Sequence, residues 1–373
     1  MATAALARRL GASVKDAGAK KGSGWYSSHM AAASRAILER IPLVDFTLEI
    51  RDARIPISSA YEDLRDFPPS SRRIIVLNKT DLADRRQTKE WLRYFEEQSC
   101  VCYGINSHNK DNIKEFLNFI QARVRELKKD DQLKYTTTIM LVGIPNVGKS
   151  SLANSLHQIG RISAAEKGKL KHTIVSPLPG ETKDISSLKI GSHPNIYVLD
   201  TPGVLHPSIL DVEMGSKLVL TGAISDSLVE ECEIAEYFLS ILNTSNEYKH
   251  WENLLAKEDE ESSRDHKTNF GGNLEVELRR RKQYLTDHTQ DFIVRDVRRT
   301  LFESISSFKG NLEDEKELSK LIKVQFIALQ EAFHIPLGSA KDINHRVALK
   351  LLNLYRTGRL GHYTLDPIPR NAK

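Results

Sequence analysis

Cysteine is scarce in this chain, and long apolar runs are missing. Only three of the 373 residues are cysteines, and no two of them form the CxxC pair that is typical of zinc sites. A disulfide framework is not expected, and a reducing compartment suits this composition. No apolar run approaches the roughly 20 residues that a membrane-spanning helix needs. The sequence therefore argues against a disulfide-stapled protein, a zinc-binding module or an integral membrane protein.

The residues that are present describe a globular protein of about two domains. Hydrophobic residues make up 40% of the chain and charged residues 28%, which is usual for a globular protein. At roughly 150 residues for each domain, the length predicts about two of them. The formal net charge of +5 is a weak bias toward acidic partners such as nucleic acid.

The first 23 residues form a basic, alanine-rich segment. Five basic residues and a single acid lie in it, and Leu6, Leu10 and Val14 share one face of an expected helix. This pattern is typical of a transit peptide for mitochondria or plastids. The alternative is a basic tail that touches RNA.

Short β-branched runs alternate with helical patterns through the first 200 residues. The strand-like runs lie at 41–50, 72–78, 101–106, 136–144, 185–190 and 195–200. The helical patterns between them lie at 88–98, 112–128 and 150–158. This alternation predicts an α/β fold with a doubly wound, mainly parallel sheet. The strand signal disappears after about residue 210, which predicts a small α-helical domain there.

The sequence GIPNVGKSS, which begins at Gly143, matches a phosphate-binding loop. A strand-like run precedes it and a helix-like run follows, which is the context that this motif needs. Its glycines let backbone N–H groups approach phosphates, Lys149 reaches the β- and γ-phosphates, and the Ser150 hydroxyl binds Mg2+. The predicted nucleotide-binding residues of this loop are Asn146, Val147, Gly148, Lys149, Ser150 and Ser151.

Two later segments are expected to complete the phosphate and metal site. In YVLDTPG, Asp200 ends a predicted strand, where its carboxylate can hold Mg2+, and the Gly203 amide can meet the γ-phosphate. In LPGETKDI, Thr182 can close over the γ-phosphate as a catalytic group and complete the Mg2+ shell. The alternative for DTPG is an ordinary turn, and the alternative for Thr182 is a solvated loop threonine.

The motif NKTD at residues 78–81 precedes the phosphate loop. In a guanine site, Asn78 would bond the base edge, Lys79 would lie along the purine ring, and Asp81 would accept the N1 and N2 hydrogens. A second base-contacting loop is expected after the next strand. The predicted base-binding residues are therefore Asn78, Lys79, Thr80, Asp81, Asn106 and Ser107. The chain order of these motifs is permuted, with the base loops first. An ATPase would require NKTD to be a coincidental turn.

In this order the motifs resemble those of the circularly permuted GTPases that assist ribosome assembly. The resemblance is carried by RDAR (51–54), NKTD, INS, GIPNVGKSS, PGET and DTPGV, and by WYSSHMAAASRAI and LLNLYRTGRLGHYTLD. The branch is that of bacterial ribosome biogenesis GTPase A and the mitochondrial ribosome-associated GTPases, which in plants includes the organellar DAR GTPases. The resemblance implies a circularly permuted P-loop G domain that hydrolyses GTP with Mg2+.

The chemistry of hydrolysis raises two questions. The residue after DTPG is Val204, which cannot orient an attacking water, so slow intrinsic hydrolysis is expected. The resemblance makes His29 a candidate for that catalytic role, and a surface or capping histidine is the alternative. The resemblance also implies that Asn146 helps to hold a K+ ion beside the phosphates, with a simple turn asparagine as the alternative. RDAR either orders a loop beside the nucleotide or forms a structural salt bridge.

The predicted organisation has five parts. They are a transit peptide (1–23), a circularly permuted G domain (24–210), helices that pack on it (211–245), a charged insertion or linker (246–290) and a C-terminal helical domain (291–373). Basic residues of the last part could contact rRNA phosphates or form solvated helix faces: Arg295, Arg298, Arg299, Arg346, Lys350, Arg356 and Arg359. Tyr355 and Tyr363 could stack on bases or belong to a core.

The leading hypothesis is a mitochondrial GTPase that assists maturation of the large ribosomal subunit. The resemblance implies the subunit and its rRNA as partners, with no DNA, and a monomer is expected. A chloroplast is the alternative compartment, and a peripheral membrane association stays open. The alternative function is a regulatory or tRNA-directed organellar GTPase with a non-ribosomal partner.

Overall fold

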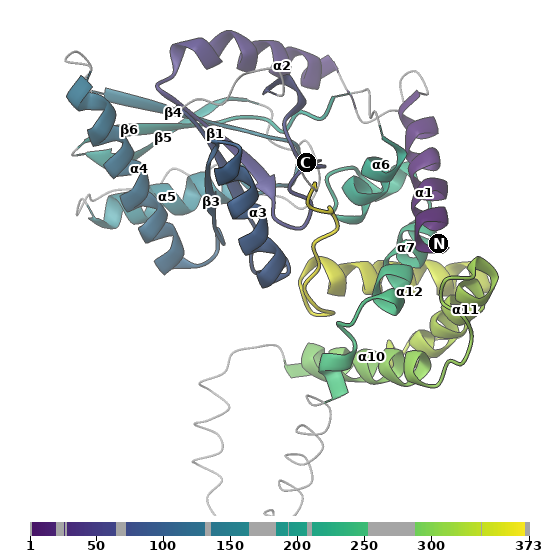
Figure 1. Ribbon diagram of the computed structural model, residues 1–373. Coiled ribbons are helices and arrows are strands. Elements are labelled where there is room, and N and C mark those ends of the chain that lie inside the picture. The colour runs from purple at the N-terminus through teal and green to yellow at the C-terminus, as the bar shows by residue number, and fades with distance from the viewer. Residues whose placement is uncertain are drawn as a thin grey trace, which may run out of the picture. The chain divides into compact units, whose positions relative to one another are not determined.

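The structure is a computed structural model. It describes residues 2–19, 26, 28–64, 72–130, 136–163, 184–192, 194–206, 211–252, 288–336 and 338–369. Thr182 and most of the predicted insertion lie outside these residues. The chain divides into two compact units (Figure 1). The sheet unit holds Gly11–Val229 and the chain from His362 onward, and the helical unit holds the chain up to Leu10 and Glu230–Gly361.

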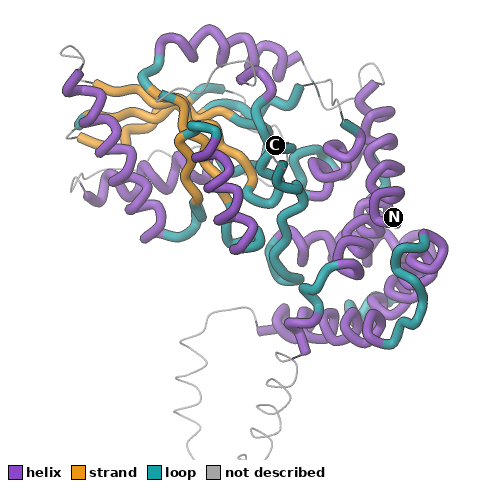
Figure 2. The backbone as a smooth tube through the Cα atoms, viewed as in Figure 1, coloured by secondary structure: helices purple, strands orange, loops and turns teal. Residues whose placement is uncertain are grey.

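Six strands form one sheet, in the order β3-β2-β1-β4-β6-β5. Strands are drawn in orange in Figure 2. Their bounds are Phe46–Asp52 (β1), Arg73–Asn78 (β2), Val101–Gly104 (β3), Thr136–Val142 (β4), Ser186–Ser192 (β5) and Asn195–Asp200 (β6). Every neighbouring pair is parallel except β5 with β6, which is antiparallel. The predicted α/β fold with a mainly parallel sheet is confirmed.

Helices cover both faces of the sheet. They are α2 (Ser28–Arg40), α3 (Arg85–Glu97), α4 (Lys110–Asp130) and α5 (Lys149–Ser163). Ile37 of α2 shares a core cluster with Val142, and Trp91 of α3 shares one with Ile75. The strand registers place Val142 and Ile75 opposite the same residue of β1, so α2 and α3 pack on one face. In Figure 1, α4 and α5 lie beside each other on the side of the sheet away from α2.

The central strand β1 is buried along its whole length although it carries charges. Glu49 accepts hydrogen bonds from Arg51 at 2.8 Å and from Arg73 at 2.6 Å. Burial by itself would raise the pKa of Glu49, but the two guanidinium charges and their hydrogen bonds outweigh it and lower that pKa. Buried charges on β1 are therefore paired, as a low-dielectric core requires.

The sheet unit also contains helical pieces from outside the strand–helix alternation. These are the later half of α1 (Ala2–Ala19), η1 (Ile41–Leu43), η2 (Glu62–Leu64), α6 (Val212–Leu220) and η3 (Asp226–Leu228). A Cβ on Gly11 of α1 would lie 1.8 Å from the Val212 carbonyl oxygen, so only glycine fits there. Val14 packs against Gly215 of α6. The predicted helical face of Leu6, Leu10 and Val14 is confirmed, and all three side chains are buried.

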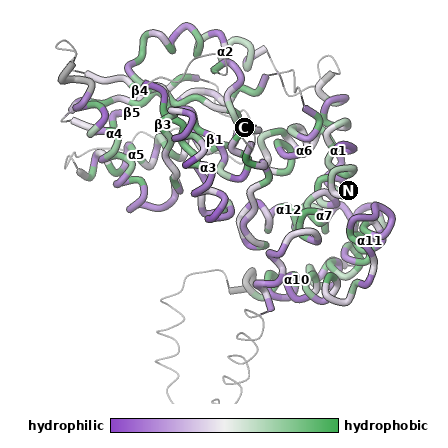
Figure 3. Tube along the Cα trace, in the orientation of Figure 1, coloured by the Kyte–Doolittle hydropathy of each residue, from purple (hydrophilic) through white to green (hydrophobic). Residues whose placement is uncertain are grey.

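The helical unit is built from α7 (Glu231–Thr244), α10 (His288–Ser306), α11 (Glu315–Ala332) and α12 (Ala340–Arg356). Hydrophobic and hydrophilic residues alternate along these helices (Figure 3). Val294, Val297, Leu301 and Ile305 form a buried stripe of α10, whereas Val324 of α11 is 56% exposed. Asn243 and Gln325 exchange two buried side-chain hydrogen bonds, of 2.7 and 3.0 Å.

A C-terminal strap, residues 362–369, belongs to the sheet unit and not to the helical one. The backbone N–H of Leu365 donates to the Arg54 carbonyl at 2.7 Å. The unit boundaries thus differ from the predicted ones at two places: the strap groups with the sheet unit, and residues 230–245 group with the helical unit. Within the residues described here, every helix is too short or too polar to span a bilayer.

Candidate nucleotide site

The predicted motifs converge at one edge of the sheet. NKTD follows β2, the second base loop follows β3, the phosphate loop follows β4 and DTPG follows β6. These four strands run parallel to one another through their shared ladders, so their carboxyl ends meet at the same edge. The permuted chain order therefore does not separate the motifs in space.

The phosphate loop joins β4 to α5, which begins at Lys149. The Lys149 ammonium is buried and donates to the carbonyls of Gly143 at 3.1 Å and Ile144 at 2.8 Å. Burial lowers the pKa of Lys149 to about 8, against the opposing charge of Asp200. A Cβ on Gly203 of DTPG would lie 2.6 Å from Pro145 Cα, so the phosphate loop and DTPG are in close contact.

Two predicted magnesium ligands flank this loop. Ser150 lies in the first turn of α5, and Asp200 is fully buried at the end of β6. The Asp200 charge acts on the Lys149 ammonium, so the carboxylate lies close to the phosphate loop. A hydroxyl and a carboxylate are the hard oxygen donors that Mg2+ takes together with nucleotide phosphates. These side chains fit Mg2+, and the third predicted ligand, Thr182, lies outside the described residues.

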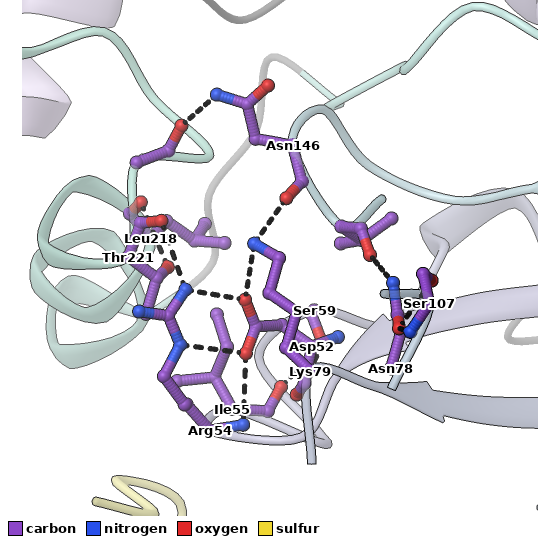
Figure 4. Close-up of polar contacts among 12 residues, drawn as sticks. Asp52, Arg54, Ile55, Ser59, Asn78, Lys79, Ser107, Asn146, Leu218 and Thr221 are labelled. Atoms are coloured by element: carbon purple, nitrogen blue, oxygen red, sulfur yellow. Dashed lines mark hydrogen bonds and ion pairs between the residues drawn. The ribbon is translucent and has the colours of Figure 1, made fainter. Parts of the chain in front are cut away.

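Asn78 of NKTD ties three loops together (Figure 4). Its side chain is 1% exposed. Its Nδ2 donates to the Val147 carbonyl at 2.8 Å, and its Oδ1 accepts from the Ser107 N–H at 3.2 Å and the Ser107 hydroxyl at 2.7 Å. A Cβ on Gly148 would lie 2.3 Å from Asn78 Nδ2, so this approach also requires a glycine. The bond from Asn78 to the base edge stays a prediction, because the observed amide contacts are all within the protein.

Lys79 reaches from β2 to the phosphate loop (Figure 4). Its ammonium donates to the Asn146 carbonyl at 2.5 Å and lies 3.0 Å from Asp52 Oδ2. Asp81 is exposed on the same loop, and the Thr80 N–H donates to the Ile105 carbonyl at 3.2 Å. The ammonium of Lys79 is thus engaged by protein groups, while Asp81 is exposed and its base-reading role stays a prediction.

Asn106 and Ser107 form a tightly bonded turn after β3. The Asn106 N–H donates to Asn112 Oδ1 at 2.7 Å, and Asn106 Oδ1 accepts from the His108 N–H at 2.8 Å. The Ser107 carbonyl accepts from the Ser155 hydroxyl of α5 at 2.8 Å. This turn is therefore fixed to the helix of the phosphate loop.

Asp52 and Arg54 of RDAR extend this network. Arg54 donates to Asp52 Oδ1 through Nε at 3.0 Å and to Oδ2 through Nη2 at 2.7 Å. Arg54 Nη2 also lies 3.3 Å from the Thr221 carbonyl. The pair is a buried salt bridge that also includes Lys79. The sequence did not predict the ion pair between Asp52 and Lys79, although β1 and β2 were both predicted strands and each motif lies at the end of its strand.

Comparison with known proteins shows the family of this chain. A family model described as 50S ribosome-binding GTPase matches residues 138–267. DAR GTPase 2, mitochondrial, of Arabidopsis thaliana is 57% identical over 99% of this chain and 97% of its own length. The chain belongs to this family of DAR GTPases. Ribosome biogenesis GTPase A of Bacillus pumilus is 35% identical over 58% of this chain and 74% of its own length. The GDP-bound structure of TM YlqF aligns over 89% of this chain and 99% of that one, at 19% identity and a TM-score of 0.46.

In this DAR GTPase, Asn146 is held by its side-chain nitrogen. Nδ2 donates to the Gly222 carbonyl, just beyond α6, at 2.8 Å. The backbone of Asn146 has a φ of 59°, a conformation that asparagine tolerates better than most residues. The K+ role of Asn146 stays a prediction.

Val204 of the DAR GTPase is a core residue and not a water ligand. It is buried in a cluster with Ile37 and Met140, against which Ala33 packs. His29 lies four residues before Ala33 and eight before Ile37, so the three side chains share one face of α2. His29 itself is exposed. The catalytic role of His29, in the first turn of α2, stays a prediction.

Several predicted rRNA-binding residues are occupied by other contacts. Arg298 donates twice to the Arg359 carbonyl, at 2.6 and 2.9 Å, and Lys350 donates to the Phe333 carbonyl at 3.0 Å. Tyr355 and Tyr363 are buried, so the core alternative is the one that the structure supports. Arg346 of α12 is exposed.

Proposed function

We propose that this DAR GTPase binds GTP with Mg2+ at the converging strand ends and assists maturation of the mitochondrial large ribosomal subunit. The observation that carries the nucleotide site is the set of Asn78 contacts, because they join both base loops to the phosphate loop. The family model for a 50S ribosome-binding GTPase and the name of ribosome biogenesis GTPase A support the ribosomal partner.

The nucleotide is held at its two ends. Asp81 accepts the N1 and N2 hydrogens of guanine, and the Lys79 stem lies along the purine ring. The amides of the phosphate loop, with Lys149, bind the β- and γ-phosphates. The remaining contacts to base and phosphates come from Asn78, Thr80, Asn106, Ser107, Val147, Gly148, Ser151 and Gly203. Ser150, Thr182 and Asp200 would hold Mg2+, which would supply positive charge for the developing phosphate charge.

Hydrolysis is slow without a partner, because buried Val204 cannot orient water. His29 orients the attacking water once the partner fixes its position, and Thr182 closes over the γ-phosphate. Asn146 would hold a K+ ion, which would supply positive charge where an arginine finger would act. Both features predict a rate that rises with ribosomal subunits and with K+.

The helical unit supplies the rRNA contact through its exposed basic side chains, with Arg346 foremost. Phosphate contacts of this kind weaken as salt rises. Localisation to mitochondria is supported by the mitochondrial relative. Residues 2–19 form helix α1 with Leu10 and Val14 buried, which argues against their removal as a transit peptide.

Sedimentation tests this proposal. The purified protein is mixed with mitochondrial ribosomal subunits and either GDP or a non-hydrolysable GTP analogue, and then centrifuged through a gradient. With the GTP analogue we expect the protein to sediment with the large subunits, and with GDP we expect it to stay at the top of the gradient. A protein that binds both nucleotides yet stays at the top in each would show that its partner is not the ribosome.

A further inference from the structure

Asp52 is a buried carboxylate that lies beside the nucleotide site and outside every nucleotide-binding motif. It ends β1 and is 2% exposed. Its own N–H donates to the Ser59 hydroxyl at 3.0 Å, and the Arg54 N–H donates to its Oδ1 at 3.0 Å. These bonds fix the direction of the carboxylate before any nucleotide arrives.

One carboxylate faces two cations at this point. Asp52 Oδ2 lies 2.7 Å from Arg54 Nη2 and 3.0 Å from the Lys79 ammonium. Burial alone would raise the pKa of Asp52, but the charges of Arg54 and Lys79, with the hydrogen bonds from Arg54, lower it well below its ordinary range. The carboxylate is therefore ionised at neutral pH and separates two positive charges in a water-poor site.

Both ends of Lys79 are held. Its backbone has a φ of 62°, which turns the chain sharply as it leaves β2. Its ammonium lies between Asp52 and the Asn146 carbonyl. The four-carbon stem is therefore stretched from the base loop to the phosphate loop, as Figure 4 shows.

We propose that Asp52 is a positioning residue for the guanine base, because its ion pair holds the Lys79 stem in the place where the purine ring lies. This inference rests on the proposed nucleotide site and adds a residue to it. Asp52 touches no nucleotide atom in this account, and it acts only through Lys79. Arg54 supports it by holding the carboxylate from the opposite side.

A double-mutant cycle in GDP affinity tests the link. Isothermal titration calorimetry with GDP and with GTP is run on the wild type, Asp52→Asn, Lys79→Ala and the double variant. We expect Asp52→Asn to weaken both nucleotides by the same factor, about tenfold, because Lys79 serves the base and not the γ-phosphate. In the Lys79→Ala background, Asp52→Asn should change the GDP affinity by no more than about twofold.

Glu49→Gln is the matched control. Glu49 lies on the same strand and is also fully buried, and its carboxylate pairs with Arg51 and Arg73 instead of Lys79. We expect Glu49→Gln to lower the melting temperature as Asp52→Asn does. Its effect on GDP affinity should be the same with and without Lys79. If Asp52→Asn does not fold, Asp52→Glu keeps the charge, displaces the carboxylate by one methylene and enters the same cycle.

The outcomes separate the inference from the function on which it rests. Equal effects of Asp52→Asn in both backgrounds would mean that Asp52 serves stability alone and would overturn the inference. If Lys79→Ala left GDP affinity unchanged, or the wild type bound no GDP, the base site itself would be wrong and the inference would fall with it. A non-additive cycle with an additive Glu49 control supports the inference.

Discussion

The side-chain amide of Asn78 donates to the carbonyl of Val147 at 2.8 Å and joins two residues that are 69 positions apart in the chain. The same amide accepts two hydrogen bonds from Ser107. Asn78 ends β2, Ser107 follows β3 and Val147 follows β4, three different parallel strands. A doubly wound sheet can therefore exchange the chain order of its strand–helix units and keep the three loops in contact, since each unit delivers its loop to the same edge.

Guanine selectivity should depend on the Asp81 carboxylate. In Asp81→Asn the amide keeps one acceptor and gains a donor, so it no longer matches the two adjacent N–H groups of guanine and instead suits xanthine. We expect GDP affinity to fall by roughly a hundredfold and xanthosine diphosphate affinity to rise. Calorimetry with GDP, xanthosine diphosphate and ADP measures this. An unchanged preference among the three would mean that NKTD is not a base-reading motif.

Nucleotide affinity should fall as pH rises through the pKa of Lys149. Burial lowers that pKa to about 8 in the nucleotide-free protein. Phosphates attract only the charged ammonium, so the binding-competent fraction is nearly complete at pH 7 and declines above pH 8. We expect GDP affinity to weaken about tenfold from pH 7 to pH 9.

Lys149→Arg is the control for this pH dependence, because a guanidinium stays charged throughout the range. Its GDP affinity is expected to be lower than that of the wild type but nearly constant with pH. A parallel decline in both proteins would assign the pH effect to the nucleotide or to another group, and not to Lys149.

The C-terminal strap should stabilise the sheet unit through Asp366. This buried carboxylate accepts from the N–H groups of Ile57 and Ser58, both at 2.8 Å, from the Ser58 hydroxyl at 2.7 Å and from the Lys217 ammonium at 2.9 Å. Asp366→Asn removes the negative charge that pairs with the Lys217 ammonium. The substitution should lower the unfolding free energy by about 3 kcal/mol. Thermal melting followed by circular dichroism measures the loss.

Glu97→Gln, which neutralises an exposed acid at the end of α3, is the control for Asp366→Asn and should change the melting temperature little. Equal melting temperatures for the two variants would show that the strap adds no stability.

The packing of α1 also makes a prediction. Leu10 is 1% exposed, so Leu10→Ala should lower the unfolding free energy by about 2–5 kcal/mol. Lys15→Ala, on the exposed side of the same helix, should have almost no effect. Guanidinium unfolding of the two variants measures this difference in unfolding free energy. Indistinguishable unfolding curves would mean that α1 does not pack in solution as it does in the structure.

The strand–helix alternation predicted the sheet and its loops well, because buried parallel strands are short apolar runs and each motif follows directly on one. The helix predicted at 112–128 is α4, Lys110–Asp130. The antiparallel direction of β5 could not be predicted, since an apolar run carries no direction. Contacts between distant segments could not be predicted either, because the Asp52–Lys79 ion pair and the Asp366 contacts depend on tertiary packing. Helix α2 has too weak a stripe of large apolar residues to be predicted from its own sequence.

The most direct test of the account is the GTP hydrolysis rate in K+ buffer, with and without purified mitochondrial large subunits. Because Val204 is buried and cannot orient water, the protein alone should hydrolyse GTP slowly, and large subunits should raise the rate by at least about tenfold. Small subunits should not, and His29→Ala should remove most of the stimulation. Normal GTP binding with no stimulation by large subunits would contradict the assembly-factor account.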